Sequence, residues 1–394
     1  MINSPRLATG RVRINLEGFM NLQALLLSSD EGILRVLRRV LSDLEIKADH
    51  CGDSDAAIRK LTRERFEAVI VDCTDEDTAA SVLRGARSAP CNRRAVAVAI
   101  IDAKTAIRSG FVLGAHFVLY KPISSERAKT SFRAARALMK RERRRNARVS
   151  VHIPITVRFN DGENQMQATT VDLGEGGTAV KLSQRPRNTD SVSVHFRLPG
   201  TEHKIGCIGG VAWENAGRQF GIRFIDLSPE NREQLKSWLE SRSPEFEKDD
   251  PPAPCKLTDL SSGGCYLEMA APLPTRTRVI LSLRFGEFQL SVEGIVRVMH
   301  PEIGMGVEFT RASAQQREHL EKFIQALTSN KGSVPELMVE PEGLETEETA
   351  VQNEAGEIKD PLLELFRNKA DVLPEAFFAE LRKQRSTASS AASA

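Results

Sequence analysis

The sequence is poor in aromatic residues, has no long apolar run and carries no excess of either charge. Only 5% of its 394 residues are aromatic, and its 55 Lys and Arg nearly balance its 53 Asp and Glu, which leaves a net charge of +2. This balance excludes a strongly basic nucleic-acid binder and a strongly acidic disordered chain as descriptions of the whole protein. No apolar stretch approaches the ~20 residues that a membrane helix needs, and the N-terminal residues lack the apolar core of a signal peptide. We therefore expect a cytoplasmic protein, and the length predicts two to four domains.

Metal-site spacing and enzyme motifs are absent as well. The 6 cysteines include no C-x-x-C pair, so we expect no zinc site and interpret the cysteines as small apolar residues of a reducing compartment. The sequence contains no G-x-S-x-G, P-loop or H-E-x-x-H motif. We therefore expect a chain that binds or interacts, and not an enzyme.

Lys and Arg are concentrated in one stretch. Residues 127–148 hold ten bases and a single acid, Glu142. The first part of this stretch has apolar residues at helical spacing, which predicts an amphipathic helix whose bases mostly face water. Those apolar residues are Ala128, Phe132, Ala135 and Leu138. The stretch shows no helix-turn-helix or recognition helix, so we do not expect DNA as a partner.

Acidic residues are concentrated nearer the C-terminus. Residues 333–358 hold eight Glu and no base. Such a stretch buries too little surface to offset its ordering entropy, so residues 331–359 are predicted to form a disordered linker. Residues 360–394 then regain Leu and Phe at helical spacing, broken at Pro374, and are predicted to form an amphipathic segment and a tail. Within them, residues 360–385 are where we expect a protein partner to bind.

Between residues 21 and 140, short apolar runs alternate with helical patterns. Runs that are apolar throughout, such as 68–71, are typical of parallel strands covered on both faces, and the alternation predicts a doubly wound α/β domain. Asp72 and Lys121 each follow such a run directly. The carboxyl ends of parallel strands are where open α/β sheets bind their ligands. Residues 1–20, ahead of this domain, are predicted to be flexible.

This segment resembles the receiver domain of bacterial response regulators in two-component systems, which has a flavodoxin-like fold. The resemblance rests on Asp72 after the third strand, on Lys121-Pro122 after the fifth, and on Gly114-Ala115 before the fifth. It implies that Asp72 occupies the phosphoacceptor position, with Lys121 beside it. The switch Ser or Thr that the family has at the end of its fourth strand is replaced here, according to the gap chosen, by Ala99, Ile100 or Ile101.

The acid pair that holds Mg²⁺ against the phosphoryl group in that family is missing. Its position reads Ser28-Ser29, and Asp30 and Glu31 are displaced onto the start of the following helix. Phosphoryl transfer to a carboxylate brings negative charges together, so the metal is needed, and neutral hydroxyls are poor Mg²⁺ ligands. We therefore expect a pseudo-receiver that serves packing or dimerisation, with Asp72 paired to Lys121. Mg²⁺ would be a cofactor only if the receiver were active.

From about residue 144 the sequence changes to short alternating segments separated by Gly and Pro turns, which predicts a small β-barrel or sandwich. A helix closes the unit, with Ser228 as its N-cap and Pro229 at its first position. The pattern then returns, because residues 171–182 match residues 258–269, 87 positions later. A repeat of this length indicates a duplicated domain.

Both units resemble the PilZ domain, a six-stranded β-barrel with a closing helix that binds the bacterial second messenger cyclic di-GMP. The resemblance places the first unit at residues 141–242 and a second, truncated and degenerate unit at residues 243–330. In the first, the R-x-x-x-R and D/N-x-S-x-x-G motifs of the family correspond to Arg144, Arg145, Arg148, Asp172, Gly174 and Gly177. In the second, the D/N-x-S-x-x-G motif is complete at Asp259, Ser261 and Gly264, but no R-x-x-x-R precedes it.

These residue types suit the nucleotide that the resemblance implies. An Arg fork binds a phosphate or a guanine edge bidentately, and Asp172 would accept hydrogen bonds from guanine N–H groups. Gly174 stands where the family has Ser, a loss of roughly 1 kcal/mol of hydrogen bonding. We expect the first unit to bind cyclic di-GMP by ordering a flexible linker over residues 140–148, which would reorient the receiver-like domain. We expect the second unit not to bind nucleotide alone, and turn chemistry by itself also explains an Asp shortly before Gly-Gly.

Two other functions fit the same sequence. A scaffold whose barrels bind only proteins would account for Gly174 and for the Arg pair that the second unit lacks. A phosphorylation-controlled response regulator with PilZ output would need Asp72 to accept a phosphoryl group. No GGDEF-like or EAL-like string is present, so messenger synthesis or hydrolysis is not expected. The first strand of the second barrel is missing from residues 241–255, and a strand from elsewhere, or from a second copy in a homo-oligomer, is expected to fill the gap.

Overall fold

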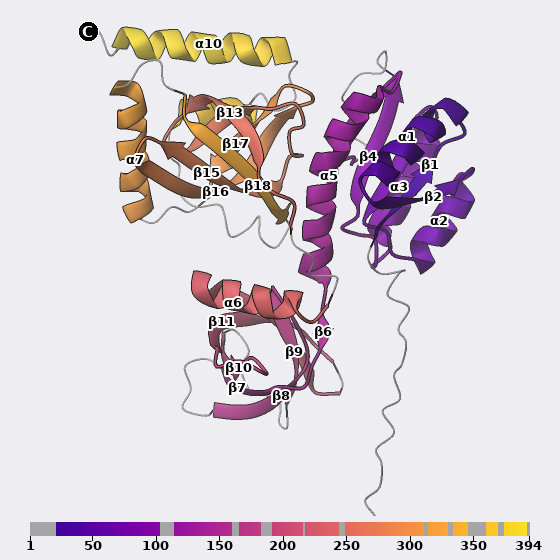
Figure 1. The fold of residues 1–394 in the computed structure, drawn as a ribbon, viewed down its shortest axis with the longest axis vertical. Helices are drawn as coiled ribbons and strands as arrows, with labels where there is room; N and C mark the ends of the chain where they lie inside the picture. The colour runs from indigo at the N-terminus through magenta and orange to yellow at the C-terminus, as the bar shows by residue number, and fades with distance from the viewer. Residues whose placement is uncertain are drawn as a thin grey trace, which may run out of the picture.

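The computed structural model describes residues 21–102, 114–159, 165–182, 191–215, 217–243, 249–310, 314–329, 334–345, 360–368 and 374–391. The N-terminal segment predicted to be flexible, residues 1–20, lies outside the described residues. Figure 1 shows an α/β domain and two barrels arranged around one long helix, α5 (Ser125–Asn146). The helix runs between the α/β domain and the second barrel, and its C-terminal end meets the first barrel.

The first domain is a five-stranded parallel sheet with the strand order β2-β1-β3-β4-β5. Helices α1 and α5 pack on one face of the sheet, and α2 and α3 on the other. This is the doubly wound α/β fold that the alternating apolar runs predicted, and it is the flavodoxin-like receiver fold that the resemblance implied. Besides α5, its elements are β1 (Leu22–Leu27), α1 (Glu31–Asp43), β2 (Ile46–Cys51), α2 (Ser54–Arg63), β3 (Ala68–Asp72), α3 (Glu76–Ser88), β4 (Val96–Asp102) and β5 (Phe117–Lys121).

The second domain is an antiparallel barrel in which β7-β10-β11-β12-β9-β8 close on one another, with the short β6 added to β8. Inward side chains from all six strands and from helix α6 form its core. The predicted cap is confirmed, because Ser228 Oγ accepts a hydrogen bond from Asn231 N and Pro229 begins α6. The elements are β6 (Val149–Ser150), β7 (Pro154–Phe159), β8 (Gln165–Gly174), β9 (Gly177–Leu182), β10 (Val192–Arg197), β11 (Lys204–Glu214), β12 (Gln219–Leu227) and α6 (Pro229–Glu240).

The third domain repeats this barrel with its first strand relocated. In the first barrel β7 pairs with β8 and β10; in the second, β18 pairs with β13 and β15, which are the repeats of those two strands. The gap is therefore filled by a strand that follows the closing helix. The elements are β13 (Ala253–Leu260), β14 (Gly264–Glu268), β15 (Thr277–Phe285), β16 (Phe288–His300), β17 (Gly304–Phe309), α7 (Ala314–Ser329) and β18 (Glu336–Leu344).

The expectation of a disordered linker over residues 331–359 is wrong for Glu336–Leu344. Leu337 and Val339 alternate into the barrel core, where each is at most 3% exposed. The free edges of β13 and β15 supply hydrogen-bond partners, and the core supplies apolar burial. The hydrogen-bond partners and the apolar burial both come from the rest of the barrel. The segment therefore forms a strand despite its acidic composition.

The C-terminal segment forms two helices, α9 (Pro361–Asn368) and α10 (Pro374–Ala391). The second helix begins at Pro374, where the sequence predicted a break. Both pack on the second barrel, and Figure 1 shows α10 lying across one end of it. No helix in the described part of the chain is both long and apolar enough to span a bilayer.

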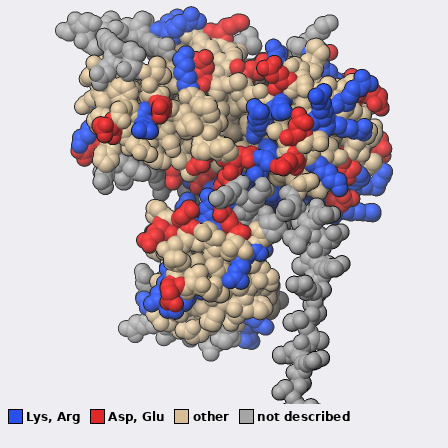
Figure 2. Space-filling view, viewed as in Figure 1, with Lys and Arg blue, Asp and Glu red and all other residues tan. Residues whose placement is uncertain are grey.

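The C-terminal half of α5 is buried, although its bases were expected to face water. Lys140, Arg143 and Arg144 are 6%, 5% and 1% exposed. Acids from other domains surround this end of the helix, and Figure 2 shows acidic and basic side chains gathered where the first barrel meets the rest of the molecule. The expectation is wrong here because helical periodicity does not show which partners a polar face meets.

Candidate functional site

The carboxyl end of the receiver-like sheet holds Asp72 in a closed set of contacts. Its carboxylate accepts hydrogen bonds from Lys121 Nζ at 2.5 Å, Thr74 Oγ1 at 2.8 Å and Ser28 Oγ at 2.9 Å. Burial alone would raise the pKa of Asp72, but the three donors together bring that pKa below its ordinary value. The pairing with Lys121 is the one expected for a pseudo-receiver.

The nearby acids do not form a metal site with Asp72. Asp30 accepts hydrogen bonds from Gly32 N and Ile33 N, so its carboxylate caps α1. Within the described residues, no three His, Cys, Asp or Glu side chains gather as metal ligands. One expectation is corrected: β4 ends at Asp102, not at residues 99–101, and Asp102 lies in register with Lys121. An acid at that strand end adds negative charge where the receiver family has a neutral hydroxyl.

In the first barrel, Arg148, Asp172 and Gly174 lie together. The Arg148 Nε atom is 3.9 Å from Asp172 Oδ1, and both side chains are about one-third exposed. A Cβ atom on Gly174 would lie 2.2 Å from Arg148 Nη1 and 2.7 Å from the Ala147 carbonyl oxygen. Glycine at this position therefore leaves room for the Arg148 guanidinium, which fills the space of a serine side chain.

Arg144 lies elsewhere, in a buried cluster of ion pairs. Its guanidinium donates to Asp249 at 2.6 Å and to Glu240 at 2.8 Å, and its Nε is 3.2 Å from Glu175. Burial raises the pKa of Glu175 against the opposing effect of Arg141 and Arg144. The cluster joins α5 to α6, to the turn between β8 and β9, and to the segment that leads into the second barrel.

Arg145 points toward the second barrel. It donates to the Leu344 carbonyl oxygen at 2.9 Å and pairs with Glu142 at 3.3 Å, while Leu344 N donates to the same Glu142 carboxylate at 2.6 Å. The expected flexible linker over residues 140–148 is therefore corrected, because residues up to Asn146 are the last turns of α5. Neutralisation by Glu142, Glu240 and the other acids stabilises these turns without a ligand.

The motif glycines have a structural explanation in both barrels. A Cβ atom on Gly177 would lie 2.3 Å from the Ile222 carbonyl oxygen, and one on Gly264 would lie 2.5 Å from that of Val307. Close pairing of β9 with β12, and of β14 with β17, thus requires glycine whether or not a ligand binds.

Trp213 is a surface residue that belongs to none of the predicted motifs. It is 47% exposed, and its ring covers Gly221, where a Cβ atom would lie 2.2 Å from the indole Nε1. Trp213 pairs with Gly221, Gly221 with Ala179, and Ala179 with Asp172, so the four residues share the outer face of neighbouring strands. Local sequence does not show that this aromatic ring is exposed on β11, three strands from Asp172 on β8. A Trp ahead of the G-I-x-F ending was nevertheless a usable signal.

The second-barrel motif forms a closed turn. Ser261 Oγ accepts a hydrogen bond from Gly264 N and donates one to the Gly264 carbonyl oxygen, both at 3.1 Å. Ser261 N donates to that carbonyl as well, at 2.8 Å. The Ser261 hydroxyl is therefore used within its own turn, as turn chemistry predicts.

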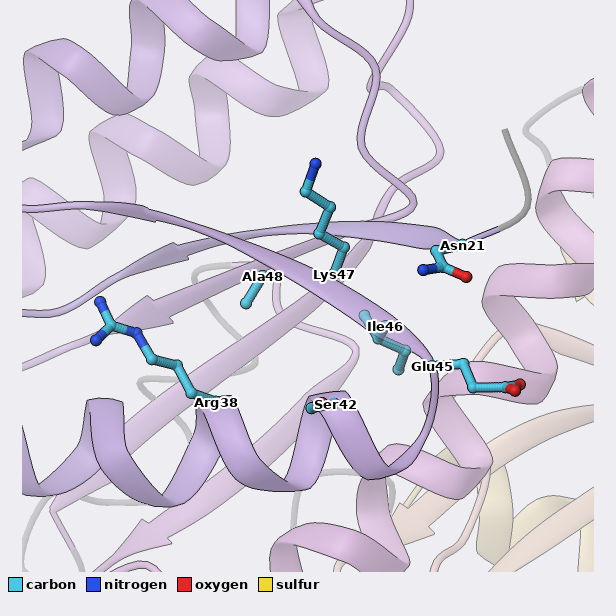
Figure 3. A pocket seen from close by; sticks show the side chains of 7 residues that line it. All are labelled: Asn21, Arg38, Ser42, Glu45, Ile46, Lys47 and Ala48. Atoms are coloured by element: carbon cyan, nitrogen blue, oxygen red, sulfur yellow. The ribbon is translucent and has the colours of Figure 1, made fainter. Parts of the chain in front are cut away.

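A shallow groove of about 320 Å³ lies at the edge of the receiver-like sheet, between α1 and β2. Figure 3 shows its lining, from Arg38 and Ser42 on the helix to Ile46 and Ala48 on the strand. Its polar side chains do not converge on one point, and none of the predicted site residues lines it.

Comparison with known proteins finds similarities to each part of this chain. The PilZ domain model matches residues 142–241 and 240–326. Among solved structures, the receiver domain of a sensor histidine kinase from Pseudomonas aeruginosa is 20% identical, with 30% of this chain and 98% of that chain covered and a TM-score of 0.27. A chemotaxis response regulator of Vibrio cholerae is 18% identical, with 29% and 98% covered and a TM-score of 0.27.

The PilZ domain of CeSA from a cellulose-synthesizing bacterium is 21% identical, with 24% of this chain and 97% of that chain covered and a TM-score of 0.21. No curated protein matches this chain.

Proposed function

The chain carries a receiver-like domain followed by two PilZ domains, and from this premise we propose that it is a non-catalytic signalling protein that binds cyclic di-GMP at its first PilZ domain. The PilZ family supports cyclic di-GMP signalling in general. The observation that carries the finer proposal is the group of Arg148, Asp172 and Trp213 on one outer face of the first barrel.

Each member of this group matches one part of the nucleotide. Arg148 offers a planar fork for a phosphodiester or a guanine edge. Asp172 accepts a hydrogen bond from Ala179 N on one oxygen and is still 32% exposed, so its carboxylate can accept from a guanine N–H. Trp213 offers an exposed ring on which a base can stack, an interaction worth about 1–3 kcal/mol per base.

Nucleotide binding at the first barrel would affect the rest of the molecule through Arg144. A phosphodiester that draws Arg144 toward the barrel competes with Asp249, Glu240 and Glu175, the three acids that now hold it. Because this cluster fastens the end of α5, exchange of partners would loosen the first barrel from the rest of the molecule. The shift in population can be no larger than the difference in ligand affinity between the two arrangements.

The test is isothermal titration of the full chain with cyclic di-GMP at physiological salt. We expect saturable binding that weakens at least tenfold in Arg148→Ala and quenches the fluorescence of Trp213, a signal absent from Trp213→Phe. Arg133→Ala is the matched control, because this arginine lies exposed on α5 and should leave the affinity unchanged. Equal affinity of the wild type and Arg148→Ala, or no binding at 100 μM ligand, would refute the proposal and favour the protein scaffold.

A further inference from the structure

The C-terminal helices cover the face of the second barrel that corresponds to the proposed ligand face of the first. By the internal repeat, Gly263, Tyr266 and Gly306 correspond to Gly176, Ala179 and Gly221. The second set lies beneath α9 and α10, whereas the first set lies beside the exposed Trp213. In the described part of the chain, α9 and α10 therefore cover this position in the second barrel, whereas in the first barrel only the Trp213 ring lies over it, at Gly221.

A single buried carboxylate joins α9 to the motif turn. Asp360 is 3% exposed, and its Oδ2 accepts a hydrogen bond from Gly263 N at 3.0 Å. Its Oδ1 accepts from Leu362 N at 2.9 Å, so the same side chain starts the helix. On the first barrel, no atom of the described residues lies within 4 Å of a Cβ atom built on the equivalent Gly176.

Apolar side chains of α9 fit against the glycines of this face. A Cβ atom on Gly263 would lie 2.7 Å from Leu363 Cδ1, and one on Gly306 would lie 2.6 Å from the Phe366 ring. Leu363 is 4% and Phe366 1% exposed. Glycine at both positions thus gives the helix the close approach that its side chains need.

Helix α10 completes the cover with aromatic contacts. Phe377 is fully buried, with its ring centroid 5.5 Å from that of Tyr266 and 4.7 Å from that of His300. At the rim of the face, Arg367 pairs with Glu308 at 3.2 Å. The arrangement has the features of a protein interface, with a buried aromatic and apolar centre and a charged rim.

We propose that the second PilZ barrel is a receptor for an acid-capped amphipathic helix pair, and that α9–α10 of the same chain is its occupant. The Asp360 carboxylate takes the place of an anionic ligand group at Gly263 N, and the docked pair closes this face to nucleotide. The proposal does not depend on what the first barrel binds.

The test uses the full chain and a fluorescently labelled peptide of residues 360–391. In the chain, Leu363→Asp with Phe366→Asp releases the helix pair from its own barrel. We expect the peptide to bind this variant saturably and at least tenfold more tightly than it binds the wild type, whose face is filled. A peptide with Asp360→Ala should bind at least fivefold more weakly, and one with Glu364→Ala, changed at an exposed position of the same helix, should bind as before.

Several outcomes would overturn the proposal. Equal binding to the wild type and the variant, or no binding to a variant whose barrel remains folded, would show that the face does not receive the pair. Unfolding of the second barrel in the variant would make the pair part of the barrel core. Asp360→Asn in the full chain keeps the helix cap and removes the charge, and it should speed tryptic cleavage after Arg367 and Arg382 at least threefold. An unchanged rate would remove Asp360 from its proposed role.

Discussion

Asp72 shows how neighbouring side chains decide what a carboxylate can do. It stands at the end of β3, where the receiver family has its phosphoacceptor, but its oxygens accept from Ser28, Thr74 and Lys121. After the end of β1, the Asp30 carboxylate caps helix α1. The position is thus occupied by an ion pair that needs no metal.

We predict that acetyl phosphate with Mg²⁺ does not phosphorylate Asp72, because Ser28 and Ser29 stand where an acid pair would hold the Mg²⁺ that offsets the charge of the incoming phosphoryl group. Intact-mass spectrometry of the wild type and of Asp72→Asn should show no difference in phosphate content. An added phosphate on the wild type alone would restore the response-regulator alternative.

Gly174 and Gly176 differ in the space around them, although both lie at the β8–β9 turn. A Cβ atom on Gly174 would meet Arg148 and a backbone carbonyl oxygen, whereas nothing lies within 4 Å of one on Gly176. We predict that Gly174→Ala lowers the free energy of unfolding of the first barrel by about 1–3 kcal/mol, and that Gly176→Ala leaves it nearly unchanged. Urea denaturation followed by Trp238 fluorescence measures both, and equal effects would contradict the crowding at Gly174.

The burial of His300 leads to a prediction of how low pH affects the C-terminal helices. Burial lowers the pKa of His300 to about 4, from 6.5 in an exposed chain. The folded state therefore favours the neutral ring. The contribution of His300 to the free energy of unfolding is fully present above pH 6.5 and is lost as the pH falls from 6.5 toward 4. The ring accepts or donates one hydrogen bond with the Tyr266 hydroxyl at 2.8 Å and packs against Phe377.

We therefore expect hydrogen exchange of α10 to be faster at pH 5 than at pH 7 once corrected for the chemical rate, and the acid effect to be smaller in His300→Gln. His319→Gln is the control, because His319 is exposed on α7. An acid effect of the same size in all three proteins would assign it to other groups.

At the scale of elements, the second barrel owes its closure to β18. This strand takes the place of β7 in the repeat, but it comes from the opposite end of the domain sequence. Leu344 at the end of β18 also contacts Glu142 and Arg145 of α5. The strand that closes the barrel therefore helps to fasten the barrel to the receiver-like domain.

We predict that Val339→Asp destabilises the second barrel by about 3 kcal/mol or more, because the carboxylate would be buried without a partner. Met338→Asp is the matched control on the same strand, since Met338 is 39% exposed. Differential scanning calorimetry should show the loss of one transition in the first variant only. If both variants melt like the wild type, β18 does not close the barrel in solution.

At the scale of the molecule, α5 connects all three domains. Its N-terminal half packs on the receiver-like sheet, and its C-terminal half exchanges ion pairs and hydrogen bonds with both barrels. In the relay that we propose, the Arg144 cluster is the part of this junction that the nucleotide disturbs.

We predict that Arg144→Ala loosens the first barrel even without ligand, because Asp249, Glu240 and Glu175 then repel one another and lose charged hydrogen bonds worth on the order of 2 kcal/mol. Small-angle X-ray scattering should show a larger radius of gyration than in the wild type, and Arg133→Ala should show no change. Cyclic di-GMP added to the wild type should shift the scattering in the same direction; an unchanged radius with saturating ligand would contradict the relay.

A doubly wound α/β domain, a small β-domain and its duplication could all be predicted from the sequence alone, and resemblance to known families added the names receiver and PilZ. These properties rest on apolar periodicity and turn residues, which act over a few neighbouring positions, and the break at Pro374 belongs with them. The contacts between distant segments could be seen only in the tertiary structure. Arg144 meets Asp249 across 105 positions, and Glu142 meets Leu344 N across 202. An acidic stretch forms β18, and the C-terminal helices pack on the motif face of the second barrel. Both depend on apolar burial and open strand edges that distant segments supply, and no local sequence pattern describes these.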